Sequence, residues 1–353
     1  MKWHYKIAAL VLVLVVNTNL YGKRVEFDKT KTVKREFNGI GSDVEIRLNN
    51  RYGRVEVTTW DQNNLVIEVD IQVTHTNEKK GQEELDNVDI EFVENSVYIQ
   101  AKTNLYGRKR ATTFATKNLK KEIVYRVKMP VGNNLNVMNR FGDVTINELK
   151  GKATIDLSYG ALSVGKLSNS KNRINLKFAQ NSSISSLQGG SLSAQYSGLT
   201  IAQCDQLNMT SQFSQIDIEQ VKEATVVSKY DKLNVDECEN LKLDAQFSTT
   251  KIERLTSKAL VTSNYGYLRL DKISSSCQEI RLHNKFGKVR LGFEAPALEF
   301  RGTIMFADLD LPHNWDVSEE SIQHTKKYNG IVNGGGTQVS VTGQYGNISI
   351  SQN

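Results

Sequence analysis

The sequence has little proline, little cysteine and no apolar run long enough to span a membrane. Three prolines among 353 residues leave few points at which a strand would lose a backbone hydrogen-bond donor. Three cysteines, none in the first 200 residues, exclude a small disulfide-dense domain and a lipid-bearing cysteine near the N-terminus. No apolar stretch approaches the roughly 20 residues that a transmembrane helix needs. What is left is ordinary globular composition, 39% apolar and 24% charged.

The sequence also has only a small excess of charge of one sign. Lys and Arg number 45 against 39 Asp and Glu, and loss of Lys2 and Lys6 with a leader would leave 43 against 39. So small an excess gives no argument for nucleic acid as a partner. Helical periodicity is missing too: residues 78–87 are the one candidate, and we expect only a short turn there.

The first 22 residues have the layout of a signal peptide. Lys2, His4 and Lys6 precede ten consecutive apolar residues, 7–16, and polar residues then lead to Gly22. Ten apolar residues suit the core of a leader and are too few for a membrane span. We therefore expect an exported protein, in the periplasm, on the outer surface or secreted, with no transmembrane segment in its mature chain.

An aromatic residue followed by a small or turn residue recurs from residue 135 onward. Consecutive pairs lie 17 to 22 residues apart, and an earlier pair, Tyr52-Gly53, places the same unit near the mature N-terminus. Such a period is typical of architectures in which each unit is completed by its neighbours. The pairs of the main run are Phe141-Gly142, Tyr159-Gly160, Phe178-Ala179, Tyr196-Ser197, Phe213-Ser214, Tyr230-Asp231, Phe247-Ser248, Tyr265-Gly266, Phe286-Gly287, Phe306-Ala307, Tyr328-Asn329 and Tyr345-Gly346.

Apolar side chains alternate on both sides of each aromatic residue. Ala153, Ile155 and Leu157 lead to Tyr159 in steps of two, which predicts that all four line one face of a strand, the core face. After the aromatic the apolar positions shift by an odd step, which predicts a tight corner at the small residue. The aromatics are therefore predicted to be core residues, and Tyr230→Asp is predicted to destabilise the fold severely.

These units predict an all-β fold, a parallel β-solenoid of two-strand repeats of about 18 residues, expected to be a right-handed β-helix. Residues 135–353 form its regular part, and residues 23–134 an N-terminal β cap with looser repeats, continuous with it. Phe and Tyr alternate from Phe141 to Phe286, so a turn of one repeat or of two is open. One repeat per turn, the expected case, places Cys204 and Cys238 about 9.6 Å apart, beyond disulfide reach; two would allow a bridge.

Two stretches of the chain resemble a known family. KMPVGNNLNV at 128–137 is followed by NRFGDV at 139–144, and NRYGRVEVTTW stands at 50–60. They are similar to the putative-adhesin β-solenoid domains of unknown function that are common in exported proteins of Gram-negative bacteria. The resemblance implies a β-helix in the cell envelope and brings no catalytic residues with it. The longer spacing after Phe286 departs from the regular pattern.

No cluster of residues indicates catalysis, a cofactor or a metal. The five histidines lack the spacing of metal ligands, and Gly334-Gly335-Gly336 lacks the other residues of a phosphate loop. Outward-facing carboxylates are the candidates for sugar chemistry or calcium binding, and we expect most of them to form a solvated surface. They are Asp217, Glu219, Asp231, Asp236, Asp271, Asp308 and Asp310.

The densest charge is a basic stretch between residues 106 and 121. A solvated loop is one interpretation of it, and contact with anionic lipopolysaccharide or another acidic glycan is the other. The stretch consists of Arg108, Lys109, Arg110, Lys117, Lys120 and Lys121, with Tyr106 and Phe114 between them.

The sequence favours a non-enzymatic adhesin of the envelope that binds a surface, a glycan or a protein partner. A repeated pattern without a unique cluster of reactive residues supports this hypothesis. A polysaccharide lyase or hydrolase is the enzymatic alternative, and a structural spacer or a component of envelope-stress signalling is a third. No cofactor and no nucleic acid are expected, and the sequence does not set the oligomeric state.

Overall fold

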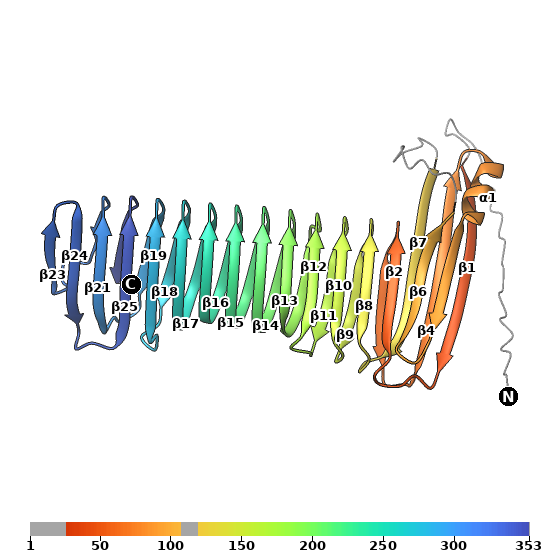
Figure 1. The fold of residues 1–353 in the computed structure, drawn as a ribbon, viewed down its shortest axis with the longest axis horizontal. Helices are drawn as coiled ribbons and strands as arrows, with labels where there is room; N and C mark the ends of the chain where they lie inside the picture. The colour runs from red at the N-terminus through yellow and green to blue at the C-terminus, as the bar shows by residue number, and fades with distance from the viewer. Residues whose placement is uncertain (1–25, 107–118, 353) are drawn as a thin grey trace. The chain divides into compact units, whose positions relative to one another are not determined.

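The computed structural model describes residues 26–106 and 119–352. The chain divides into two compact units, residues 1–166 and residues 167–353. Both consist almost entirely of strands, so the all-β prediction is confirmed (Figure 1). In the described part of the chain no helix is long and apolar enough to cross a membrane. The expected leader, residues 1–22, lies outside the described residues.

The first unit combines antiparallel and parallel strand pairs. Its elements are β1 (Phe27–Asn38), β2 (Glu45–Arg51), β3 (Val55–Trp60), β4 (Asn64–His75), α1 (Glu78–Asp86), β5 (Val88–Glu94), β6 (Tyr98–Leu105), β7 (Leu119–Pro130), β8 (Leu135–Arg140), β9 (Val144–Leu149) and β10 (Ala153–Ser158), with β11 (Leu162–Leu167) at its end. Strand β4 pairs antiparallel with β1 and β7, while β2 pairs in parallel with β6 and β8. Residues 52–134 separate β2 and β8 in the sequence, yet these two strands pair directly.

Residues 78–86 form a complete α-helix where the sequence analysis expected only a short turn. Its N-cap is Asn77, whose side-chain oxygen accepts a hydrogen bond from the backbone N–H of Lys80 at 3.0 Å. Lys29 of β1 forms an ion pair with Glu78 at 2.7 Å. The prediction was wrong because only Gly81 and Leu85 are buried, too few apolar residues to produce a helical period.

The second unit is built from strands, most of which pair in parallel. They are β12 (Asn172–Lys177), β13 (Ser182–Gln195), β14 (Gly198–Gln212), β15 (Gln215–Lys229), β16 (Lys232–Gln246), β17 (Thr249–Asn264), β18 (Tyr267–Ile273), β19 (Glu279–Lys285), β20 (Lys288–Phe293), β21 (Leu298–Met305), β22 (Leu309–Asp310), β23 (Val317–Ile322), β24 (Thr325–Val332), β25 (Thr337–Gln344) and β26 (Ile348–Gln352). From β13 to β16 one strand covers nearly a whole repeat and pairs with the next along its length.

The register shows that each repeat pairs with the next one. Ile201 of β14 is opposite Ile218 of β15, which is opposite Val235 of β16. By the same register Val221 lies between Cys204 and Cys238, so these two cysteines are two strand spacings apart, about 9.6 Å. All three cysteines are unbridged and buried.

The core of each repeat is formed by side chains at fixed steps from the aromatic residue. In the repeat that follows Tyr196 these are Leu199, Ile201, Cys204, Leu207 and Met209, all at most 5% exposed. The same steps give buried residues in the neighbouring repeats, so like side chains pack against like along the strand stack. The alternation of apolar residues in the sequence therefore predicts the core correctly as far as the second residue before each aromatic, such as Ala194 before Tyr196.

The aromatic residues themselves are not in the core, which corrects the prediction. Phe178, Tyr196, Tyr230 and their equivalents in the second unit are 41–50% exposed. Their φ angles are 51–56°, in the left-handed region, whereas the strand residues before them are extended. A left-handed residue reverses the alternation at that point, so its side chain points outward and the small residue after it points inward. The Phe/Tyr period therefore marks an exposed corner.

The last strands do not follow sequence order. Strand β25 pairs in parallel with β19 on one side and β21 on the other, and β26 likewise pairs with β20 and β22. Strands β21, β24 and β23 then pair antiparallel. Tyr328 lies within β24 and is 5% exposed, so Tyr328-Asn329 is not a corner pair as the spacing had suggested. This insertion accounts for the irregular spacing after Phe286.

Candidate functional site

The corner residues of the second unit form one continuous ladder of stacked rings. From Phe178 to Phe286 adjacent ring centroids are 4.8 to 5.1 Å apart, with interplanar angles of 3 to 12°. The stack continues from Phe286 to Tyr345 at 4.9 Å and from Tyr345 to Phe306 at 5.1 Å, and ends with His324 on Phe306. We call the nine rings the aromatic ladder: Phe178, Tyr196, Phe213, Tyr230, Phe247, Tyr265, Phe286, Tyr345 and Phe306.

Phe and Tyr alternate strictly along the aromatic ladder, including its last rings, whose order in the stack differs from their order in the chain. In the chain Phe286 is followed by Phe306, but in the stack Tyr345 lies between them. The first unit has a shorter stack of the same kind, in which Phe141 lies between Tyr52 and Tyr159 at centroid distances of 5.4 and 5.0 Å. Phe and Tyr therefore alternate along the folded surface even where the order of the rings in the stack differs from their order in the chain.

The ladder presents ring edges, because the ring faces are covered by neighbouring rings. At 4.9 Å and nearly parallel, rings such as Phe213, Tyr230 and Phe247 leave no space for a planar group between them. The exposed part of each ring is its outer edge, and every second edge carries a tyrosine hydroxyl. The surface is an apolar stripe with a regularly placed hydrogen-bonding group.

The small residue after each ring fills the inner side of the corner. Ser197 accepts a hydrogen bond from the backbone N–H of Ala179 at 3.1 Å, and Ser214 accepts one from Ser197 at 3.1 Å. Where this residue is glycine, a carbonyl of the preceding repeat takes the space: a Cβ on Gly160 would lie 2.1 Å from the oxygen of Gly142. The inner corner therefore holds the backbone of each ring in its strained conformation.

Asp231 occupies this inner position, which corrects its assignment to the outer surface. It is 5% exposed and accepts hydrogen bonds from the hydroxyls of Ser211 at 2.6 Å and Ser228 at 2.8 Å. The backbone N–H groups of Ser214 and Lys229 also donate to it, at 2.7 and 3.0 Å. Its carboxylate is thus fully occupied in holding the corner and is not available to a ligand.

The other outward carboxylates differ in position: Glu219 and Asp236 lie at the opposite bend of the repeats, Asp217 and Asp271 are engaged by neighbouring side chains, and Asp308 and Asp310 follow the last ring. Glu219 and Asp236 line a shallow depression of about 510 Å³ together with Glu253. Asp271 forms ion pairs with Lys251 and Arg269. Among the described residues no group of His, Cys, Asp and Glu is arranged to hold a metal ion. The structure thus gives these carboxylates no geometry for acid–base chemistry on a sugar.

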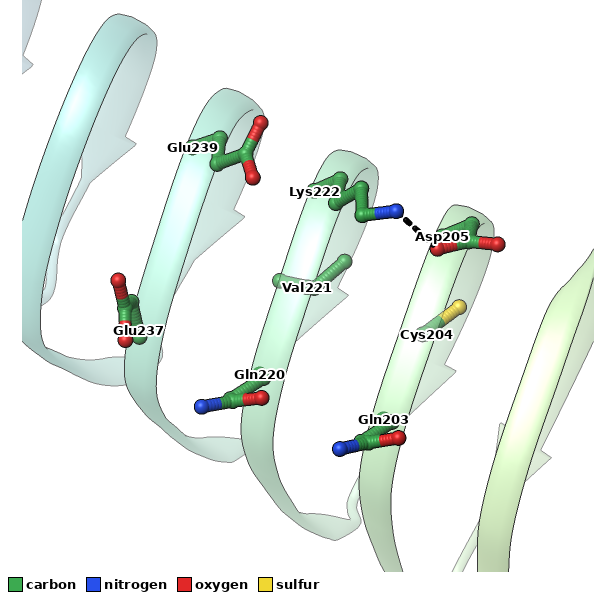
Figure 2. A pocket seen from close by; sticks show the side chains of 8 residues that line it. All are labelled: Gln203, Cys204, Asp205, Gln220, Val221, Lys222, Glu237 and Glu239. Atoms are coloured by element: carbon green, nitrogen blue, oxygen red, sulfur yellow. Dashed lines mark ion pairs between the residues drawn. The ribbon is translucent and has the colours of Figure 1, made fainter.

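A second depression, of about 290 Å³, lies at the same bend (Figure 2). Asp205, Lys222 and Glu239 follow one another on successive repeats, and Lys222 reaches Asp205 at 2.8 Å. Hydrogen bonding to Asp205 raises the pKa of Lys222. Burial raises the pKa of the Cys204 thiol in the floor of the depression to about 12, so no reactive thiolate forms there at neutral pH.

The basic stretch expected to contact an anionic ligand is only partly described. Arg108, Lys109, Arg110 and Lys117 lie outside the described residues, as does Phe114. Of the remaining two, Lys120 forms an ion pair with Glu26 at 3.4 Å and Lys121 one with Glu84 at 3.0 Å. Both lysines lie on β7, Lys120 exposed and Lys121 largely buried, and contact of the stretch with a glycan stays a prediction.

No family model matches the sequence, and no curated protein matches it. Among solved structures, a putative adhesin from Bacteroides fragilis is 9% identical over 92% of this chain and 97% of its own, with a TM-score of 0.25. A putative lipid binding protein from Parabacteroides distasonis is 10% identical over 90% and 96%, with a TM-score of 0.31. A putative cell adhesion protein from Clostridium sporogenes is 8% identical over 92% and 100%, with a TM-score of 0.20. Adhesin-named proteins are thus among the structural neighbours, as the sequence resemblance predicts.

Proposed function

We propose that this protein is an exported, non-enzymatic adhesin of the cell envelope and that the aromatic ladder is its contact surface. In this proposal the paired repeats form a parallel β-solenoid, right-handed as parallel crossovers almost always are, and residues 23–134 cap its first end. The leader-like residues 1–22 support export. The observation that carries the proposal is a row of half-exposed aromatic rings held at left-handed corners.

The energetics of the corner give these rings a structural role that is compatible with a surface role. A left-handed conformation costs a bulky L-residue about 1–2 kcal/mol, whereas Gly and Asn adopt it readily. Stacking returns about 0.5–1.5 kcal/mol per ring pair. Burial of about half of each ring adds a hydrophobic contribution, so the rings stabilise the strand stack and also present an exposed edge. We propose that this exposed edge is the contact surface.

The experiment replaces every second ring. A variant with Tyr196, Tyr230, Tyr265 and Tyr345 changed to Asn keeps residues suited to the left-handed corner and removes the hydroxyls and half of the apolar edge. We expect wild-type protein to bind immobilised cell-envelope fractions or members of a glycan array, and the variant to bind at least about tenfold more weakly. Circular dichroism checks that both are folded.

The matched control changes the opposite bend. Asp205→Asn, Lys222→Gln and Glu239→Gln alter exposed side chains at the opposite bend of the repeats and should leave binding unchanged. The proposal fails if the wild-type protein binds neither the fractions nor the array, which would favour a passive spacer. It fails equally if the ladder variant binds as well as wild type.

A further inference from the structure

Five lysines, four of them exposed and Lys285 half-buried, lie beside the aromatic ladder at every third ring. Lys177, Lys229 and Lys285 directly precede a ring, and Lys232 and Lys288 follow one by two residues. The rings concerned are Phe178, Tyr230 and Phe286, which are every third ring of the stack. Three strand spacings separate one cationic group from the next, about 14 Å. The positive charge therefore recurs along the ladder from Phe178 to Phe286.

None of these five lysines forms an ion pair with a carboxylate in the described residues, unlike several lysines elsewhere in the unit. Lys222 is paired with Asp205 at 2.8 Å, Lys251 with Asp271 at 3.6 Å, and Lys258 with Glu279. Lys285 instead lies 5.6 Å from the ring centre of Phe286. Unpaired cations beside an exposed apolar stripe give this face a positive potential that favours an anionic partner.

Few exposed carboxylates oppose this charge, and the buried Asp231 between Lys229 and Lys232 already accepts four hydrogen bonds. Asp217 lies two residues beyond the ladder flank and is engaged by Asn234 at 2.6 Å, and Asp244 is near Gln246. Asp308 directly flanks the last ring, Phe306. Between the cationic groups the flanks carry mainly uncharged polar side chains, such as Gln195, Gln212 and Asn264, which both donate and accept hydrogen bonds.

The geometry points to a linear acidic polysaccharide as the ligand, which we propose lies along the aromatic ladder and is held by these lysines. Its carboxylate or sulfate groups would meet the lysines, and its hydroxyls the amides and the tyrosine hydroxyls. The inference rests on the proposed function and names the ligand class for the same surface. A repeating polymer matches a surface that repeats every one or two strand spacings.

Two other occupants fit the same surface less well. Single-stranded nucleic acid binds such proteins by stacking its bases on aromatic faces, and here neighbouring rings cover those faces. A second copy of this chain, docked ladder to ladder, would bring lysines against lysines, which opposes association.

The test uses residues 23–353 and measures binding to polygalacturonate, neutral dextran and single-stranded DNA. A lysine variant carries Gln at Lys177, Lys229, Lys232, Lys285 and Lys288. The control variant, with the same change in net charge, carries Gln at five lysines that are at least five residues from any ladder ring in the chain: Lys171, Lys222, Lys242, Lys258 and Lys272. Surface ion pairs add little stability, so both variants should fold.

We expect salt-sensitive binding of polygalacturonate that weakens at least about tenfold in the lysine variant and less than about twofold in the control variant. Equal weakening in both variants, no binding of polygalacturonate, or tighter binding of DNA would overturn the inference. If polygalacturonate fails while the Tyr→Asn variant still loses binding to neutral glycans or envelope fractions, the proposed function stands and only the ligand class is wrong.

Discussion

A Val226→Asp variant is expected not to fold, whereas Tyr230→Asp, four residues further along, is expected to keep the fold. Val226 is 2% exposed in β15 and lies opposite Met209 and Leu243 on the neighbouring strands. An unpaired carboxylate there costs more than about 4 kcal/mol of unfolding free energy. Tyr230 is 49% exposed at a left-handed corner that Asp tolerates, so its replacement should cost at most about 2 kcal/mol.

Circular dichroism without denaturant shows whether Val226→Asp folds, and urea denaturation measures the loss of stability in Tyr230→Asp. The comparison also decides between the inward orientation expected from strand alternation and the outward orientation that the structure shows. A loss of stability in Tyr230→Asp as large as that in Val226→Asp would mean that the ring is buried after all.

Gly160→Ala is the second substitution with a large expected effect. A Cβ at this position would lie 2.1 Å from the carbonyl oxygen of Gly142 in the preceding repeat, and that oxygen belongs to the backbone. The two repeats must move apart to admit it, at a cost of at least about 3 kcal/mol in unfolding free energy. Thermal unfolding of the purified variant measures the loss.

Gly132→Ala is the matched control in the same unit. Nothing lies within 4 Å of the Cβ that it would add, and its φ is not in the left-handed region. Its stability should stay within about 0.5 kcal/mol of wild type. Equal stability of the two variants would show that the repeats are not stacked as closely at Gly160 as the structure has them.

The sequence predicts the strands and most of the core because both follow from period-two alternation. Positions such as Leu199, Ile201 and Leu207 are buried where the apolar pattern places them. The pairing of each repeat with the next also agrees with the expected arrangement and keeps Cys204 and Cys238 apart. These features are local or repeat identically, so one unit of sequence is enough to infer them.

The outward orientation of the rings could not be predicted because it depends on one backbone angle. The pattern leading to Tyr159 continues the core alternation, and nothing in it reveals that φ turns positive at the ring. Bulky aromatic residues rarely adopt that conformation, so propensity argues against it. The available signal was the next residue: Gly, Ala or Ser at nearly every corner is small because it, and not the ring, points inward.

The order of the last strands was also beyond sequence reasoning. Placing β25 between β19 and β21 depends on long-range pairing, which no local pattern encodes. The alternation of Phe and Tyr gave a hint, since Phe286 and Phe306 are consecutive in the chain and break it unless Tyr345 lies between them.

The most direct measurement is nitration of tyrosines in the free and ligand-bound protein, followed by mass spectrometry. The account predicts that Tyr196, Tyr230, Tyr265 and Tyr345 react in the free protein and are protected by a bound envelope fraction or glycan. Tyr328 should stay unreactive in both states, because burial and its contact with Glu319 raise its pKa to about 12. Unreactive ladder tyrosines in the free protein, or ladder tyrosines that a bound ligand leaves fully reactive, would contradict it.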